Sequence, residues 1–376
     1  MNLSWARLFA VLLKEFTQMR RDRLTFGMIV GVPIIQLVLF GFAINTDPKG
    51  LPAALAAGDE SPFSRALVQA LEHSQYFKFT HRVSSPAEAD RLLQLGEVQF
   101  ALVIPPDFSR KLQRGERPQL LLAADATDPS ATGNALAALS PVISQALRRE
   151  LTGPLSSSRS SDLPVDVRVQ RRYNPEGISR YNIVPGLMGV ILTMTMIMMT
   201  ALAMTRERER GTMENLLATP VRPLEVMVGK IAPYIMVGYL QVCLILSAAW
   251  ALFNVPMIGS LTLLSLVLVV FIAANLAVGF TFSTIAQNQL QAMQMTFFFF
   301  LPSMLLSGFM FPFRGMPSWA QAIGEWLPLT HFLRIVRGIL LKGNGAAEVL
   351  PELWPIVVFL LLAGLLALKR YRQTLD

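Results

Sequence analysis

Long apolar segments separated by short polar ones dominate the pattern along this chain. A helix needs about 20 apolar residues to cross a bilayer core of about 30 Å, because each residue adds about 1.5 Å. No Asp, Glu, Lys or Arg occurs between Lys230 and Arg314, which leaves room for three such helices. The pattern therefore predicts an α-helical membrane protein with six transmembrane helices, at about 24–45, 181–205, 225–253, 259–286, 288–311 and 351–369.

The segment 46–178 has a different pattern, with charged residues of both signs and frequent helix-start signals. Ser61-Pro62, Ser85-Pro86 and Asp128-Pro129 each combine an N-cap residue with a proline at the first helical position. Strands alternating with these helices indicate a compact α/β domain, inserted between the first and second transmembrane helices. The predicted strands lie between His73 and His81, at 100–104, at 119–123 and around 165–169.

Basic residues beside the apolar segments predict the orientation, because Lys and Arg collect on the cytoplasmic side of a membrane. With six helices, all three basic clusters fall on that side. The N- and C-termini are then cytoplasmic, the segment 46–178 is extracytoplasmic, and 179–376 is a five-helix transmembrane domain. The clusters are Arg20, Arg21 and Arg23; Arg206, Arg208 and Arg210; and Lys369, Arg370 and Arg372.

Residues 1–23 carry Trp5, Phe9 and further apolar side chains at helical spacing, with Arg7 and Lys14 on the opposite side. This pattern predicts an amphipathic cytoplasmic helix that leads into the first transmembrane helix. The helix either lies at the membrane interface or packs on a soluble partner, and both can hold together.

The composition supports a membrane protein and argues against a nucleic-acid partner. Hydrophobic residues make up 53% of the chain and charged residues 15%, against about 25% charged residues in an average soluble domain. The formal net charge of +8 is mostly explained by the three cytoplasmic clusters. The chain shows no basic stripe with interleaved aromatics of the kind that binds nucleic acid.

A phosphate-binding loop of the type Gly-x-x-x-x-Gly-Lys-[Ser/Thr] is missing from the chain. The nearest fragment is Gly229-Lys230, but Leu224 occupies the first glycine position and Ile231 the last position. We therefore expect no cofactor and no enzyme activity on this chain. If ATP drives the protein, a partner chain hydrolyses it.

Histidines and carboxylates do not form a catalytic or metal-binding pattern. His73, His81 and His331 have no second His or Cys at metal-ligand spacing, and we interpret all three as surface or interface residues. Asp125 and Asp128 follow a predicted strand and precede a predicted helix. We interpret this pair as helix-capping rather than catalytic.

The second apolar segment is rich in methionine, including Met188, Met196 and Met199. Thioether side chains are flexible, so such a surface can line a path for varied apolar molecules. Ordinary helix packing explains the same pattern and remains open as an alternative.

A dense polar island separates the second and third apolar segments, at 206–223. Its sequence is Arg206-Glu-Arg-Glu-Arg-Gly-Thr-Met-Glu-Asn-Leu-Leu-Ala-Thr-Pro220. Charged residues are costly inside a bilayer, so this loop must lie in water at the cytoplasmic face. Gly211 permits a sharp bend, and Leu216 and Leu217 can fill a groove on a partner protein.

A second distinctive segment, 312–345, links the fifth and sixth apolar segments on the outer side. Its tryptophans suit the level of the lipid head groups. We expect short helices that dip into the outer leaflet, with the two arginines near lipid phosphates or the outer domain. The residues that characterise this segment are Pro312, Pro317, Trp319, Trp326, Pro328, Thr330, Arg334, Arg337 and Gly338.

These two motifs and the arrangement of apolar segments resemble the permease subunits of type-2 ABC transporters, especially bacterial exporters of multidrug or lipophilic compounds with a large periplasmic domain. The resemblance covers nearly the whole chain. It implies that the loop 206–223 couples the permease to a separate ATPase subunit, which holds ATP and Mg²⁺, and that the segment 312–345 forms an outer gate or interface. The implied coupling residues are Glu207, Glu209, Gly211, Thr212, Glu214, Leu217, Thr219 and Pro220.

The resemblance further implies a bacterial inner-membrane location and a pair of permeases, identical or paralogous, with two ATPases. A periplasmic adaptor and an outer-membrane channel are implied as possible partners. We expect export of an amphiphilic or lipophilic compound. The alternative is a membrane receptor or mechanical transmitter that is coupled to an ATPase without a transport path. The residues leave the substrate open.

Overall fold

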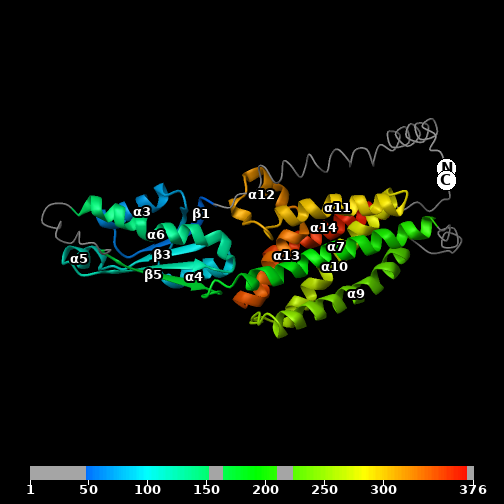
Figure 1. Cartoon of the computed structure of the whole chain (residues 1–376), viewed down its shortest axis with the longest axis horizontal. Helices are drawn as coiled ribbons and strands as arrows, with labels where there is room; N and C mark the ends of the chain where they lie inside the picture. The colour runs from blue at the N-terminus through cyan, green and yellow to red at the C-terminus, as the bar shows by residue number, and fades with distance from the viewer. Residues whose placement is uncertain (1–47, 152–163, 210–222, 371–376) are drawn as a thin grey trace, which may run out of the picture.

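The computed structural model describes residues 48–151, 164–209 and 223–370 (Figure 1). Strands and short helices gather at one end of the molecule, and long helices fill the other end (Figure 1). We call residues 51–172 the sheet region and residues 179–370 the helical region. The helix predicted at 1–23, the transmembrane helix predicted at 24–45 and most of the loop 206–223 lie outside the described residues.

The sheet region is built on five strands in the order β2-β1-β3-β4-β5. β3 and β4 are antiparallel, with Phe100 opposite Ala124, and the other neighbours are parallel. The pattern did not predict β1, because its alanine-rich sequence Leu-Pro-Ala-Ala-Leu-Ala-Ala lacks the β-branched residues that mark strands. The strands are β1 Leu51–Ala57, β2 Phe77–Arg82, β3 Phe100–Ile104, β4 Gln119–Asp125 and β5 Asp166–Arg172.

Helices cover both faces of this sheet and begin where the sequence predicts. The Ser61, Ser85 and Asp128 side chains each accept a hydrogen bond from a backbone N–H of the first turn. Leucines of α3 and α6 pack with Phe100 and Leu102 on one face, and α4 packs on the other. The helices are α3 Pro62–His73, α4 Pro86–Leu95, α5 Phe108–Gln113 and α6 Pro129–Glu150.

The helical region contains five long helices, and four of them have a stretch long and apolar enough to cross a membrane, within the described residues. These stretches are Ser179–Arg206, Tyr234–Ala251, Leu261–Ile285 and Ala346–Arg370. The helix at the fifth predicted position, Gln289–Leu306, is not among these four. The long helices are α7 Ser179–Glu209, α9 Pro223–Ala251, α10 Leu261–Ile285, α11 Gln289–Leu306 and α14 Ala346–Arg370.

α10 lies at the centre of the helical region and packs against α7 and α14. In α10 and α7, 56% of the most apolar stretch is buried, whereas only 17% is buried in α9 and α14. The latter two helices therefore present wide apolar surfaces to their surroundings. Exposed side chains on them include Met236, Leu240, Leu244 and Trp250 of α9 and Trp354, Leu361, Leu362, Leu365 and Leu366 of α14.

Short helices connect α11 to α14 and lie between the sheet region and the long helices (Figure 1). The prediction of short helices in the segment 312–345 is confirmed. They are the 3-10 turn Phe313–Gly315, α12 Ser318–Gly324, α13 Pro328–Arg337 and the π-helical turn Gly338–Lys342.

Candidate functional site: a polar junction under the sheet region

α13 is anchored by its apolar face, which leaves its polar side chains in fixed positions. Leu329, Phe332 and Val336 are fully buried. The Phe332 ring stacks on Phe271 of α10, with ring centroids 4.0 Å apart. Because these contacts hold α13 against the long helices, His331 and Arg334, one turn apart, point to the same neighbours.

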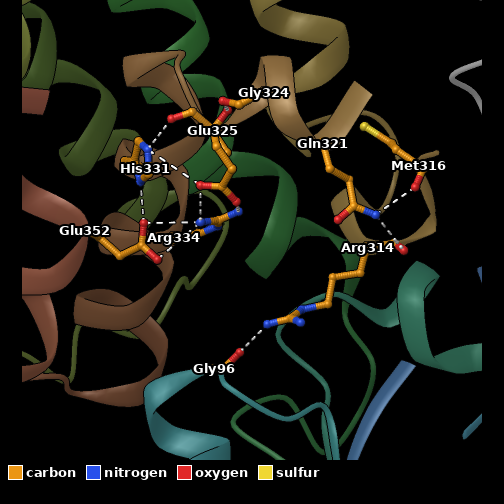
Figure 2. Close-up of polar contacts among 10 residues, drawn as sticks. Gly96, Arg314, Met316, Gln321, Gly324, Glu325, His331, Arg334 and Glu352 are labelled. Atoms are coloured by element: carbon orange, nitrogen blue, oxygen red, sulfur yellow. Dashed lines mark hydrogen bonds and ion pairs between the residues drawn. The ribbon is translucent and has the colours of Figure 1, made fainter. Parts of the chain in front are cut away.

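Two polar side chains of α13 form a cluster with Glu325 at the end of α12 and Glu352 of α14 (Figure 2). We call Glu325, His331, Arg334 and Glu352 the outer polar cluster. Arg334 Nη2 lies 2.6 Å from Glu325 Oε1, and its Nη1 lies 3.2 Å from Glu352 Oε1. Burial alone would lower the pKa of Arg334, but the hydrogen bonds and charges of the two carboxylates outweigh burial and raise it.

The His331 ring lies between two oxygen atoms of this cluster. Its Nδ1 lies 2.5 Å from Glu352 Oε2, and its Nε2 lies 2.8 Å from the Glu325 carbonyl oxygen. The ring therefore joins the Glu352 side chain of α14 to the backbone at the end of α12. The interpretation of His331 as a surface or interface residue is corrected, since its side chain is buried within the helical region.

A second group of contacts joins the helical region to the sheet region; we call it the domain junction. Arg314 Nη2 donates to the Gly96 carbonyl at 2.8 Å (Figure 2). Lys342 Nζ lies 2.5 Å from Asp125 Oδ2 and 3.1 Å from the Leu93 carbonyl. Both side chains of this ion pair are only 9% exposed. The junction therefore rests on a buried charge pair between residues far apart in sequence.

Asn182 of α7 connects the domain junction to Arg337. Its Nδ2 donates to the Thr127 carbonyl at 2.9 Å, and its Oδ1 accepts from Arg337 Nη2 at 3.1 Å. Arg337 Nη1 donates to the Gly308 carbonyl at 3.3 Å. Burial lowers the pKa of Arg337, although the charges of Asp125 and Asp128 oppose this shift.

A cavity of about 280 Å³ lies between the two regions, and we call it the junction cavity. Both groups of contacts contribute to its wall, so it is bordered by charges of both signs. Its charged lining consists of Asp125, Asp128, Glu325, Glu348 and Glu352, with Arg314, Arg334, Arg337 and Lys342.

The structure brings together only some of the residues that the sequence predicted for the outer gate. Arg334, Arg337 and Gly338 line the cavity together with Pro312. Pro317 and Pro328 start α12 and α13, and Thr330 Oγ1 donates to the Gly324 carbonyl at 2.7 Å. Trp319 and Trp326 are exposed on the outside instead.

The expected surroundings of Arg334 need correction, whereas Arg337 does face Asp125 and Asp128 of the sheet region. Arg334 binds two carboxylates within the helical region, so its charge is already paired. The charged side chains that hydrogen-bond to the sheet region are Arg314 and Lys342, which the sequence reasoning missed. The only available signal was that both are cations in the segment 312–345, as are Arg334 and Arg337.

Of the eight coupling residues that the resemblance implies, Glu209 is described with its side chain. Glu209 ends α7 and accepts two hydrogen bonds from Gln289, one from its backbone N–H at 2.8 Å and one from its side chain at 2.5 Å. These hydrogen bonds lower the pKa of Glu209. The side chain of Glu207 and all of Gly211, Thr212, Glu214, Leu217, Thr219 and Pro220 lie outside the described residues.

Comparison with known proteins now places the chain. A family model described as "ABC-2 family transporter protein" matches residues 23–369. The chain belongs to this family. It is 30% identical over 376 residues to the "Probable multidrug ABC transporter permease YbhS" of Escherichia coli (strain K12), covering 99% of this chain and 98% of that protein.

Two further relatives of the permease come from the same organism. It is 27% identical over 367 residues to the "Probable multidrug ABC transporter permease YbhR", covering 98% of each chain. It is 30% identical over 368 residues to the "Inner membrane transport permease YhhJ", covering 91% of this chain and 93% of that protein. The resemblance on which the sequence analysis relied is thereby confirmed.

Proposed function

We propose that this permease is the membrane subunit of an ATP-driven exporter, which moves an amphiphilic or lipophilic compound out of the cytoplasm or the inner leaflet. One observation carries the proposal: the chain matches ABC-2 permeases over nearly its whole length and contains no phosphate-binding loop. A separate ATPase subunit with bound ATP and Mg²⁺ then supplies the energy, and this chain hydrolyses nothing.

The cargo class is supported by the long helices. The stretch between Lys230 and Arg314 holds no charged residue, and a small ion would need charged or carbonyl-lined sites along its path. Met188 and Met196 of α7 are fully buried, which favours packing, whereas Met199 is exposed. Two relatives carry "multidrug" in their names, which fits an amphiphilic or lipophilic cargo.

The proposed topology has six transmembrane helices in a bacterial inner membrane, with both termini in the cytoplasm and the sheet region outside. Four of the six transmembrane helices are the long apolar helices described above. We propose that α11 and the segment 24–45 are the other two. Single cysteines can be placed at Ser156, Thr212 and Gln373 in a Cys243→Ala background and labelled with a membrane-impermeant reagent. The cysteine at position 156 should react from outside the cell, and those at positions 212 and 373 only from the cytoplasmic side. A cytoplasmic Ser156 would refute this topology.

We further propose that two permeases, identical or paralogous, pair side by side. The wide apolar surfaces of α9 and α14 support such pairing, because a lipid environment or a second helix surface must cover them. A periplasmic adaptor and an outer-membrane channel would complete the route, and the sheet region is the surface on which an adaptor would dock.

The coupling role of the loop 206–223 is tested by Glu214→Arg. A reversed charge in a docked groove is far more costly than one in solvent. The variant should therefore insert normally but lose co-purification with the ATPase, or hydrolyse ATP without transport. Glu60→Arg, on an exposed residue of the sheet region, is the matched control. Unchanged co-purification and transport in the Glu214 variant would refute the coupling assignment.

Transport itself is tested with the permease and its ATPase in liposomes. ATP-dependent movement of an apolar or amphiphilic dye should occur, and such compounds should stimulate hydrolysis. Stimulation by inorganic ions or polar sugars alone would exclude the cargo class. If the compounds change ATP hydrolysis without moving across the bilayer, the alternative of a receptor or mechanical transmitter replaces the exporter.

A further inference from the structure

The junction cavity contains a cation that lacks a carboxylate partner among the described residues. Arg337 donates only to neutral acceptors, the Gly308 carbonyl and the Asn182 side chain. Arg334 and Lys342, which line the same cavity, each bind a carboxylate within 3.2 Å. The charges of Asp125 and Asp128 act on Arg337 only from a distance, and an anion in direct contact would offset more of the cost of withdrawing a guanidinium from water.

Three residues that line this cavity each have a buried polar atom without a hydrogen-bond partner among the described residues. Seven buried side-chain nitrogen or oxygen atoms lack a hydrogen bond in the described part of the chain, and three of them belong to residues that line this cavity. They are Arg337 Nε, Asn344 Oδ1 and Gln99 Oε1. Buried polar groups are normally paired, so this concentration points to a ligand with polar atoms of its own.

Arg314 adds a second guanidinium to the same wall. Its hydrogen-bond partner is the Gly96 carbonyl, which carries no charge, and the residue is exposed to solvent. Figure 2 shows its guanidinium directed toward Gly96, apart from the carboxylates of the outer polar cluster. Arg314 and Arg337 are thus cations of the cavity wall for which no direct ion pair is found among the described residues, although five carboxylates also line the cavity.

The cavity also has an apolar side and a limited size. Phe313, Leu333, Ile335 and Val349 contribute to its lining. Its volume of about 280 Å³ corresponds to about nine water molecules at roughly 30 Å³ each. This volume fits a head group with its first carbons and excludes a whole lipid molecule.

We propose that the junction cavity binds the anionic head group, a phosphate or a carboxylate, of an amphiphile. Arg337 and Arg314 provide the positive charges, while Asn344 and Gln99, which line the same cavity, hydrogen-bond the remaining polar atoms. This inference rests on the proposed export function and deepens it, because it names an anionic class of cargo. The bound head group would bridge the sheet region and α13.

The test uses the purified full-length permease in a non-ionic detergent and follows its melting temperature by tryptophan fluorescence. Dodecyl phosphate is the probe. Dodecyltrimethylammonium has the same tail with the opposite charge, and inorganic phosphate has the same head without a tail. We expect saturable stabilisation by dodecyl phosphate, none by the cationic detergent, and much weaker stabilisation by inorganic phosphate.

Arg337→Gln should weaken the apparent affinity for dodecyl phosphate by about tenfold or more, because a charge-assisted hydrogen bond is lost. Arg65→Gln, on an exposed residue of α3, should leave it unchanged. If Arg337→Gln melts too early to be measured, Arg314→Gln replaces it, with a smaller expected loss. Unchanged affinity in the cavity variant used, or equal stabilisation by the cationic detergent, would overturn the site.

If inorganic phosphate bound with the same affinity as dodecyl phosphate, the proposal that the ligand is an amphiphile would be refuted, since the tail would contribute nothing to binding. The outcome is distinguishable from failure of the proposed function. Binding that depends on Arg337, combined with no ATP-dependent movement in liposomes, would refute the exporter and keep the site.

Discussion

Replacing Lys342 with methionine tests whether the buried ion pair holds the sheet region on the helical region. Methionine keeps much of the apolar stem and removes the charge. Lys342 Nζ contacts Asp125 Oδ2 at 2.5 Å and the Leu93 carbonyl at 3.1 Å, and it lies 5.1 Å from the centre of the Tyr173 ring. The substitution removes all three interactions at once.

The expected magnitude follows from what remains behind. Asp125 Oδ1 still accepts hydrogen bonds from the Thr127 backbone N–H and hydroxyl, but Oδ2 loses its cation in a site that is only 9% exposed. Removing one partner of a buried pair costs about 3–5 kcal/mol, because the other charge stays buried and unpaired. We expect a loss of stability in this range and a melting temperature several degrees lower.

A second variant, Asp125→Asn, removes the negative charge of Asp125 while keeping the shape of its side chain. Asp125→Asn keeps an oxygen for Thr127 and removes the negative charge, so the double variant Lys342→Met/Asp125→Asn leaves no unpaired charge. Replacing both members of a buried pair is often close to neutral. The double variant should therefore recover most of the stability lost by Lys342→Met, so the coupling energy between the two residues should be at least as large as the stability recovered.

Thermal unfolding of the four proteins in one detergent, followed by fluorescence and calorimetry, completes this double-mutant cycle. Lys111→Met, which removes a lysine from a surface ion pair with Asp107, controls for loss of any surface charge and should change stability by less than about 1 kcal/mol. A Lys342→Met protein that melts with the parent, or a double variant no more stable than Lys342→Met, would refute the reasoning.

Three further predictions concern other parts of the chain. Gly279→Ala places a Cβ 2.5 Å from an α7 carbonyl oxygen and should destabilise the protein by about 1–3 kcal/mol, whereas Gly133→Ala, in open space, should melt like the parent. Burial alone would raise the pKa of Asp59, but hydrogen bonds from Ser109 and Ser61 outweigh burial and lower the pKa. Its stabilisation is therefore present above the ordinary aspartate pKa and disappears as the pH falls through the folded value, so Asp59→Asn should destabilise at pH 7 and match the parent at low pH in unfolding experiments; an equal difference at both would contradict this. Glu209→Ala should speed amide hydrogen exchange in the first turn of α11, and unchanged exchange would show that the contact is dispensable.

Local patterns in the sequence determined much of the secondary structure. Ser61, Ser85 and Asp128 announced three helix starts because capping needs only a side-chain oxygen and the backbone N–H groups of the next turn. The lengths of the apolar segments predicted the long helices for a similar reason, since each helical residue adds a fixed rise toward the thickness of the bilayer. Family membership followed from a contiguous motif, which needs no tertiary structure to be recognised.

Tertiary structure alone decided the partners of the charged residues. His331 is buried between two carboxylates because α13 packs on α10 through Phe332, and its sequence neighbours carry no sign of that. Lys342 meets Asp125, 217 positions away, only after the sheet has formed and docked. Charge pairing of this kind depends on distance in space and on exclusion of water, and neither quantity is written in a local pattern.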